Sequence, residues 1–150
     1  SLSYGLTLCH ENEAGIYGER AENCLEIIKA FNGKIKAVFD MGNFALFKHD
    51  PIKAYQILKE YIEYFHIKDA MSVGAIVPPG KGEAKIFEIL ADYIKDAKKD
   101  TLITLEPHLQ TFSGLNALTE FKFDNPYKYE SPRLAFLDAV EKLREILDTL

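Results

Sequence analysis

Four residues with side chains that can bind a metal ion each follow a short apolar stretch of this sequence. Glu11 comes after "LTLCH", Asp40 after "KAVF", His66 after "EYF" and Glu106 after "LITL". Three carboxylates and one imidazole suit hard divalent ions such as Mn²⁺ or Mg²⁺, and Zn²⁺, Co²⁺ or Fe²⁺ can use the same ligands. One acidic residue at one strand end is more often a turn former or a helix cap. Four such residues at the ends of successive strands favour a shared site.

The elements expected to carry these residues are short strands that alternate with amphipathic helices. Hydrophobic periodicity predicts strands over residues 4–11, 33–40, 63–70 and 101–107, and helices over residues 19–31, 51–61, 83–99 and 131–147. Two helix starts are marked by caps, Asp50 before Pro51 and Ser131 before Pro132. The segments 41–50, 71–82 and 108–130 are expected to be loops.

This βαβαβαβα order predicts an α/β fold with parallel strands. Two architectures fit, an open doubly wound sheet or part of a (βα)8 barrel. A complete barrel needs about 250 residues, so a chain of 150 residues supplies only half of one. In either architecture the C-terminal strand ends share one rim, where binding sites form. We therefore expect the four candidate ligands to converge there.

The composition, 47% hydrophobic and 27% charged, is typical of a single globular domain, here residues 1–150. The net charge of −5 argues against a non-specific nucleic-acid surface. No apolar run approaches the roughly 18 residues of a membrane span, and the first residues do not resemble a signal peptide. Cys9 and Cys24 lack metal-binding spacing and are interpreted as small buried residues in a reducing compartment, which predicts a cytoplasmic protein.

Four short motifs carry a resemblance to a known family. "HENEAG", "FDMGNF", "HIKDA" and "LEPHL", in this order and at these intervals, resemble the sugar phosphate isomerase/epimerase family. That family belongs to the xylose-isomerase-like barrel superfamily, which also includes D-tagatose 3-epimerase and endonuclease IV. The resemblance extends from Tyr4 to the last helix and corresponds to the C-terminal half of the family, strands five to eight. It implies a (βα)4 half of a TIM barrel.

The resemblance also implies roles for the four strand-end residues. Glu11, Asp40, His66 and Glu106 would be the metal ligands, and the two glutamates would move the proton. The implied activity is a metal-dependent isomerisation or epimerisation of a sugar or sugar phosphate through an enediolate. This chemistry is reasonable because a carboxylate on each face of the substrate can remove or return a proton beside a metal-polarised carbonyl.

Three further residues are predicted to contact the substrate. Asn43 occupies a place where relatives often carry a histidine. A role of Asn43 in binding the substrate is therefore possible, and a role as a metal ligand is less favoured. Lys68 has the strand parity of His66, so it could hold a substrate oxyanion, or it could be a strand-end lysine that reaches solvent. His108 lies two residues after Glu106 and is either a substrate contact or a loop histidine.

Other polar residues near the strand ends have alternative interpretations. Glu13 shares the parity of Glu11 and could replace it as the ligand. Asp69 is expected to cap the following loop or to orient Lys68. The loop "PPGKGE" could hold an anionic substrate before a helix, although a plain turn is the more frequent use of such a sequence. His10 is expected to pack against a helix.

Two alternatives to the isomerase/epimerase hypothesis stay open from the sequence. One is a metal-dependent hydrolase or endonuclease on the same scaffold, in which the metal activates water. The other is a non-catalytic half barrel that keeps its ligands. The expected partner is a small sugar or sugar phosphate, with neither nucleic acid nor membrane. Because four strands cannot close a barrel, we also expect a homo-oligomer in which two copies complete one.

Overall fold

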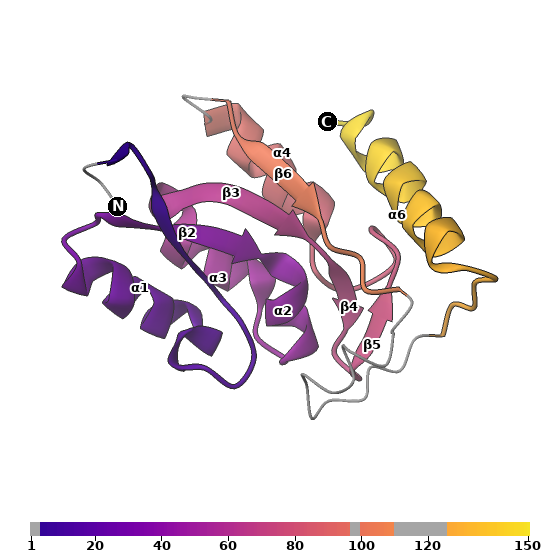
Figure 1. Cartoon of the computed structure of the whole chain (residues 1–150), viewed down its shortest axis with the longest axis horizontal. Coiled ribbons are helices and arrows are strands. Elements are labelled where there is room, and N and C mark those ends of the chain that lie inside the picture. Colours follow the sequence, from indigo (N-terminus) through magenta and orange to yellow (C-terminus); the bar gives the residue numbers. More distant parts are fainter. Residues whose placement is uncertain (1–3, 97–99, 110–125) are drawn as a thin grey trace.

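Four parallel strands form the main sheet, in the order β1-β2-β3-β6 (Figure 1). The computed structural model describes residues 4–96, 100–109 and 126–150. The strands span Leu8–Glu11 (β1), Ile35–Asp40 (β2), Ile62–Ile67 (β3) and Leu102–Leu105 (β6). The longer helices span Ala21–Ala30 (α1), Pro51–Leu58 (α3), Ile86–Asp96 (α4) and Pro132–Leu147 (α6). The α/β fold with parallel strands is therefore confirmed.

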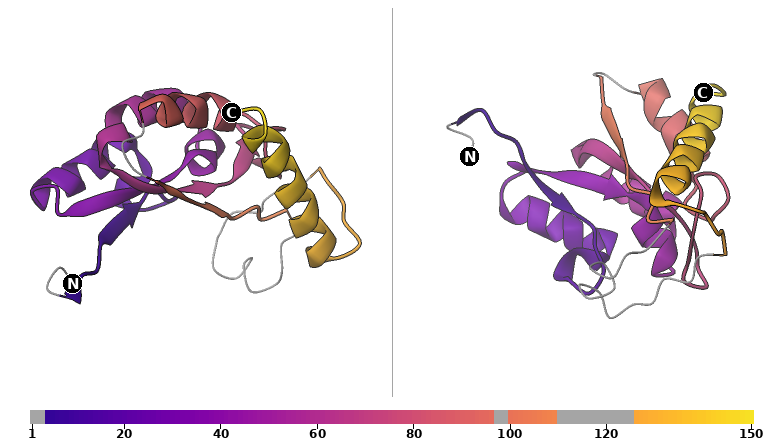
Figure 2. Two further views of the ribbon diagram at one scale, coloured as in Figure 1. Left: turned by 90° about the horizontal axis from the view of Figure 1, so that it is seen from above. Right: turned by 45° about the vertical axis from the view of Figure 1, so that its right-hand side comes forward.

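Helices α1, α3 and α4 lie on one face of the sheet, on the outer side of its curve in Figure 2. Phe39 of β2 and Phe65 of β3 are fully buried there. The Phe39 ring lies 6.1 Å from that of Tyr55 in α3, and the Phe65 ring lies 4.9 Å from that of Tyr93 in α4. A doubly wound sheet would carry helices on both faces. This one-sided layer instead matches the wall of a barrel.

The other face of the sheet carries the strand residues of opposite parity. Asp40 of β2 pairs with His66 of β3 in the strand register. Because side chains alternate along a strand, both point away from the helix layer that buries Phe39 and Phe65. The register thus places two of the candidate ligands side by side.

All four predicted strands are shorter in the structure, and the physical reason is clearest for the first and the third. The first begins at Leu8 rather than at residue 4, because Gly5 adopts a turn conformation with φ of 70° and residues 4–8 are exposed. The third ends at Ile67 rather than at residue 70, because the chain leaves the main sheet at Lys68. The predicted helix 83–99 begins at Ile86, and residues 97–99 lie outside the described part of the chain.

Two segments expected to be loops contain regular structure. A helix, α2, spans Met41–Leu46, and its N-cap is Asp40, whose carboxylate accepts the Asn43 N–H at 2.9 Å. All six residues of α2 are buried, so the segment has no amphipathic period to reveal it. After β3, the strands Asp69–Met71 (β4) and Ala75–Val77 (β5) pair as an antiparallel hairpin. Single 3₁₀ turns occur at Tyr17–Glu19 (η2) and Lys59–Tyr61 (η3).

The two cysteines differ in how deeply they are buried. Cys24 is buried in α1, its thiol donates to the Gly18 carbonyl at 2.9 Å, and burial raises its pKa to about 12. Cys9 is only half-buried, so the expectation of a buried residue holds for Cys24 alone. Among the described residues, no helix combines the length and hydropathy that crossing a membrane would require.

Candidate metal centre

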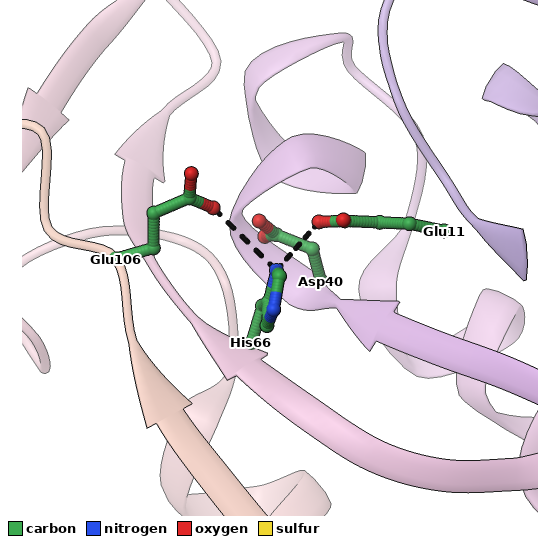
Figure 3. Close-up of side chains that lie close together, drawn as sticks. All are labelled: Glu11, Asp40, His66 and Glu106. Carbon is green, nitrogen blue, oxygen red and sulfur yellow. Dashed lines mark hydrogen bonds and ion pairs between the residues drawn. The ribbon is translucent and has the colours of Figure 1, made fainter. Parts of the chain in front are cut away.

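The four predicted ligands converge at the C-terminal end of the sheet. Glu11 and Asp40 are the last residues of β1 and β2, His66 is the penultimate residue of β3, and Glu106 directly follows β6. Each offers one ligand atom, and these atoms all lie within 4.8 Å of one another. Figure 3 shows the four side chains pointing toward one another from neighbouring strands. Parallel strands bring their ends to one rim, and this produces the cluster from residues up to 95 positions apart.

His66 lies between two carboxylates. Its Nδ1 is 2.7 Å from Glu11 Oε1 and 3.5 Å from Glu106 Oε2 (Figure 3). These carboxylates, Glu106 first and then Glu11, raise the pKa of His66 to about 10 against the opposing effect of burial. The imidazolium therefore neutralises part of the carboxylate charge when no other cation is bound.

Asp40 provides the test of whether the cluster fits a metal ion. Its side chain is fully buried, and Oδ1 accepts the Asn43 N–H at 2.9 Å. Oδ2 is buried and accepts no hydrogen bond from the described residues. The Lys68 ammonium lies 3.1 Å from it and forms an ion pair with it. A fully buried carboxylate that belongs to a set of four ligand atoms within 4.8 Å of one another fits a cation.

The Glu106 carboxylate lies beside three side chains that can carry a positive charge, His66, Lys68 and His108. Its Oε1 lies 3.1 Å from His108 Nε2, and its Oε2 lies 3.6 Å from Lys68 Nζ. Hydrogen bonds to His108 and His66 hold the pKa of Glu106 well below its usual range. Its backbone N–H donates to the Ile67 carbonyl at 3.0 Å, which fixes the position of Glu106 beside the end of β3. Glu106 is therefore ionised at neutral pH.

Lys68 does not reach solvent, so that interpretation of it was wrong. The residue is 3% exposed, and its ammonium lies between Asp40 and Glu106. Burial acts to lower the pKa of Lys68, but the charges of Asp40 and Glu106 outweigh it and hold the pKa above its usual value. Burial likewise raises the pKa of Asp40, while Lys68 acts in the opposite direction. We interpret the two residues as a buried ion pair.

The cluster and the sheet around it can be compared with known proteins. The family model of the xylose isomerase-like TIM barrel matches residues 3–148. The chain belongs to this family. A search of curated proteins found no match. The family predicted from the four motifs is thus confirmed, while the assignment to strands five to eight stays a prediction.

Solved structures with the same fold are about twice as long as this chain. A xylose isomerase domain protein from Planctomyces limnophilus superposes with a TM-score of 0.66 at 18% identity, over 97% of this chain and 48% of that one. D-psicose 3-epimerase from Clostridium cellulolyticum H10 gives 0.66 at 14% identity, over 97% and 50%. The 3-keto-D-glucoside 4-epimerase from E. coli gives 0.62 at 14%, over 96% and 48%. At these identities the likeness shows the fold alone.

One residue that supports the four-residue cluster was missed in the sequence. Asn12 is buried next to Glu11, and its amide donates to the Asp40 carbonyl at 2.8 Å and accepts the Asp40 N–H at 3.0 Å. The Asn43 side chain in turn donates to the Asn12 carbonyl at 2.9 Å. These bonds join the ends of β1 and β2. Its position between Glu11 and Glu13 marked Asn12 as a polar residue near the site. Its pairing with Asp40, however, could not be predicted from the spacing along the chain.

The substrate contacts predicted for Asn43, Lys68 and His108 stay predictions, although their surroundings differ. Asn43 and Lys68 are buried and already bonded to other residues of the site. His108 is about one-quarter exposed at 26%, lies beside Glu106 and has backbone φ of 45°. His108 is thus the most accessible of the three to a bound molecule.

The backbone N–H groups of the loop "PPGKGE" and its neighbours bind the Asp69 carboxylate. This carboxylate accepts the backbone N–H groups of Ala70, Gly80, Gly82 and Ala84 at 2.8 to 3.0 Å. A Cβ at Gly82 would lie 2.2 Å from Asp69 Oδ1. The donors of "PPGKGE" therefore hold Asp69 and not a bound anion. The expectation that Asp69 caps this loop is confirmed.

The remaining alternatives concern β1 and the residues after it. Glu13 is exposed, accepts the Ala14 N–H at 2.7 Å and lies outside the four-residue cluster. His10 packs against the η2 turn, where a Cβ at Gly18 would lie 1.9 Å from its Nε2. Burial lowers the pKa of His10. The expected packing role of His10 is confirmed.

Proposed function

We propose that the chain acts as a metal-dependent isomerase or epimerase of a sugar or sugar phosphate. The observation that carries this proposal is the meeting of four ligand atoms within 4.8 Å at the rim of the parallel sheet. Two of the structural neighbours are epimerases, which supports the same class of reaction. The net charge of −5 supports a small-molecule substrate over a nucleic acid.

Glu11, Asp40, His66 and Glu106 would hold the metal ion. Mn²⁺ or Mg²⁺ suits this oxygen-rich set best, and Zn²⁺, Co²⁺ or Fe²⁺ fits its single imidazole as well. When bound, the ion would polarise the substrate carbonyl and so make the neighbouring C–H more acidic. Oδ2 of Asp40 is buried and accepts no hydrogen bond from the residues that the structure describes, with only the Lys68 ion pair beside it, which supports its assignment as a ligand.

Glu11 and Glu106 would perform the proton transfer. In Figure 3 they approach from opposite sides of His66 and Asp40. A substrate carbon held between them can lose its proton to one carboxylate, which gives an enediolate, and the other carboxylate can then return a proton. Return to the opposite face of the same carbon is epimerisation, and return to the neighbouring carbon is isomerisation. Hydrogen bonds from His108 and His66 hold the pKa of Glu106 below its usual range, so this carboxylate is ionised at neutral pH.

His108 would contact the substrate beside Glu106. Its Nε2 lies 3.1 Å from Glu106 Oε1, so it can orient this carboxylate and also reach a hydroxyl group bound next to it. Asn43 and Lys68 would affect the substrate through Asp40, because both are buried and both contact the Asp40 carboxylate.

Proton exchange in D₂O tests the proposal. The Mn²⁺-loaded chain is incubated with a panel of ketoses and ketose phosphates, and NMR follows deuterium at the carbon next to the carbonyl. Glu106→Gln is expected to slow exchange by about 10²–10⁴-fold and to weaken Mn²⁺ binding much less. Glu88→Gln, at an exposed helix position, should change neither.

The outcomes separate the alternatives. Equal loss of exchange and of Mn²⁺ binding in Glu106→Gln would make Glu106 a ligand without an acid/base role. Mn²⁺ binding with no exchange on any sugar would favour a non-catalytic chain. Cleavage of abasic DNA, with no sugar exchange, would favour a metal-dependent endonuclease and contradict the proposal.

A further inference from the structure

Lys68 brings a positive charge into the cluster that would hold the metal ion. Its ammonium lies 3.1 Å from Asp40 Oδ2 and 3.6 Å from Glu106 Oε2, and both residues belong to the ligand set. The residue is 3% exposed. A lysine in this position lies against two of the carboxylates that would hold the cation.

The backbone holds Lys68 in this position from two sides. A Cβ at Gly42 of α2 would lie 2.5 Å from the Lys68 carbonyl oxygen and 2.8 Å from Lys68 Cβ. On the other side the next residue, Asp69, is fixed by four backbone N–H groups. The lysine is therefore a built part of the site and not a side chain that folded inward by chance.

Asp40 does not need Lys68 to keep its orientation. The Asn43 N–H holds Oδ1 at 2.9 Å, and the amide of Asn12 bonds both the N–H and the carbonyl of Asp40. The contribution of Lys68 to the centre is consequently its charge. It reduces the net charge of the three carboxylates, Glu11, Asp40 and Glu106, from three negative charges to two when His66 is neutral.

We propose that Lys68 is an internal counter-ion, a positioning residue that matches the centre to one divalent cation. This inference rests on the proposed metal-dependent function and adds to it a reason for divalent selectivity. Lys68 competes with the cation for Asp40 Oδ2 and Glu106 Oε2. Its repulsion grows with the charge of the cation, so a trivalent ion is opposed more strongly than a divalent one.

Calorimetric titration of Mn²⁺, and luminescence titration of Tb³⁺, test this role with Lys68→Met. Methionine keeps most of the side-chain volume and removes the charge. The dissociation constant of Mn²⁺ is expected to fall by about tenfold or more, and that of Tb³⁺ to fall by a larger factor. Lys53→Met, at an exposed lysine 4.0 Å from Asp50, should leave both constants unchanged.

A second pair of variants covers the case in which Lys68→Met does not fold. Asp40→Asn and Asp40→Asn with Lys68→Met are compared, because the double variant leaves neither buried charge without its partner. Removing Lys68 should tighten Mn²⁺ binding in this background too. Weaker or unchanged binding of both ions would overturn the counter-ion role. Absence of Mn²⁺ binding by the unaltered chain would instead contradict the proposed function and, with it, the need for a counter-ion.

Discussion

At the scale of single residues, the protonation of His66 competes with the binding of a metal ion. Its ring lies 2.7 Å from Glu11 and 3.5 Å from Glu106, and these carboxylates raise its pKa to about 10. A metal ligand must be the neutral imidazole, so a metal ion has to displace the proton that these carboxylates stabilise. The cluster therefore has two alternative states, one with a proton on His66 and one with a metal ion beside the neutral imidazole.

Replacement of His66 by alanine should mainly affect metal affinity. We expect Mn²⁺ affinity to fall by about a hundredfold, because the single nitrogen ligand is lost. Titration calorimetry measures this change. His49→Ala is the matched control, since His49 also contacts a glutamate, Glu19 at 3.4 Å, but lies outside the cluster. Unchanged affinity in His66→Ala would exclude this residue from the ligands.

The sequence could predict the four ligands but not the contacts between them. Each of the four follows an apolar strand, and parallel strands share a rim, so convergence follows from topology. The Lys68–Asp40 pair depends on how β2 and β3 are aligned, and their register shifts between Ala37 and Val38. Spacing along the chain does not contain that information. The role of Asn12 was missed for the same reason.

At the scale of elements, the long amphipathic segments were predictable and the short buried ones were not. Helices α3 and α6 begin at the predicted caps, Asp50 and Ser131. Helix α2 and the β4–β5 hairpin were missed because they are short and almost wholly buried. Helix α2 has six residues, and each strand of the hairpin has three. A short buried segment shows neither the helical nor the strand period. These missed elements are the ones that hold Asp40 and Lys68 in place.

Asp69 connects the hairpin to the loop before α4, and its replacement by asparagine should destabilise the fold. Oδ1 accepts the N–H groups of Ala70 and Ala84, and Oδ2 accepts those of Gly80 and Gly82. In either orientation an asparagine would place its amino group against two N–H donors. We expect the free energy of unfolding to fall by about 2–4 kcal/mol, as measured by urea denaturation.

Asp50→Asn is the control for this prediction. Oδ1 of Asp50 accepts both the Ile52 and the Lys53 N–H groups, so an asparagine can keep both bonds with its carbonyl oxygen. Its unfolding free energy should change by less than about 0.5 kcal/mol. Similar small effects in the two variants would show that the four bonds to Asp69 do not organise the loop.

At the scale of the whole molecule, the outer strands of the sheet expose apolar side chains. Within the described residues, β1 and β6 each pair with one neighbour. Leu8 of β1 is 49% exposed and Leu102 of β6 is 64% exposed. Unpaired strand edges with exposed leucines favour association with another chain. The two-fold dimer predicted from the sequence therefore stays a prediction that these edges support.

Sedimentation equilibrium at micromolar concentration tests the association. The chain is expected to sediment at about twice its monomer mass of 17.0 kDa. Leu102→Lys should weaken the dimer about tenfold or more, because it places a charge at the edge. Val73→Lys, at an exposed position of the hairpin turn, should not. A stable monomer of the unaltered chain would rule out the dimer.

We propose that Glu11, Asp40, His66 and Glu106 together hold one divalent ion. Anomalous diffraction from crystals grown with Mn²⁺ tests it most directly. One strong peak is expected, with a ligand atom of each of the four side chains within about 2.0–2.6 Å of it. A peak elsewhere in the chain, or a peak from which two of these side chains point away, would contradict it.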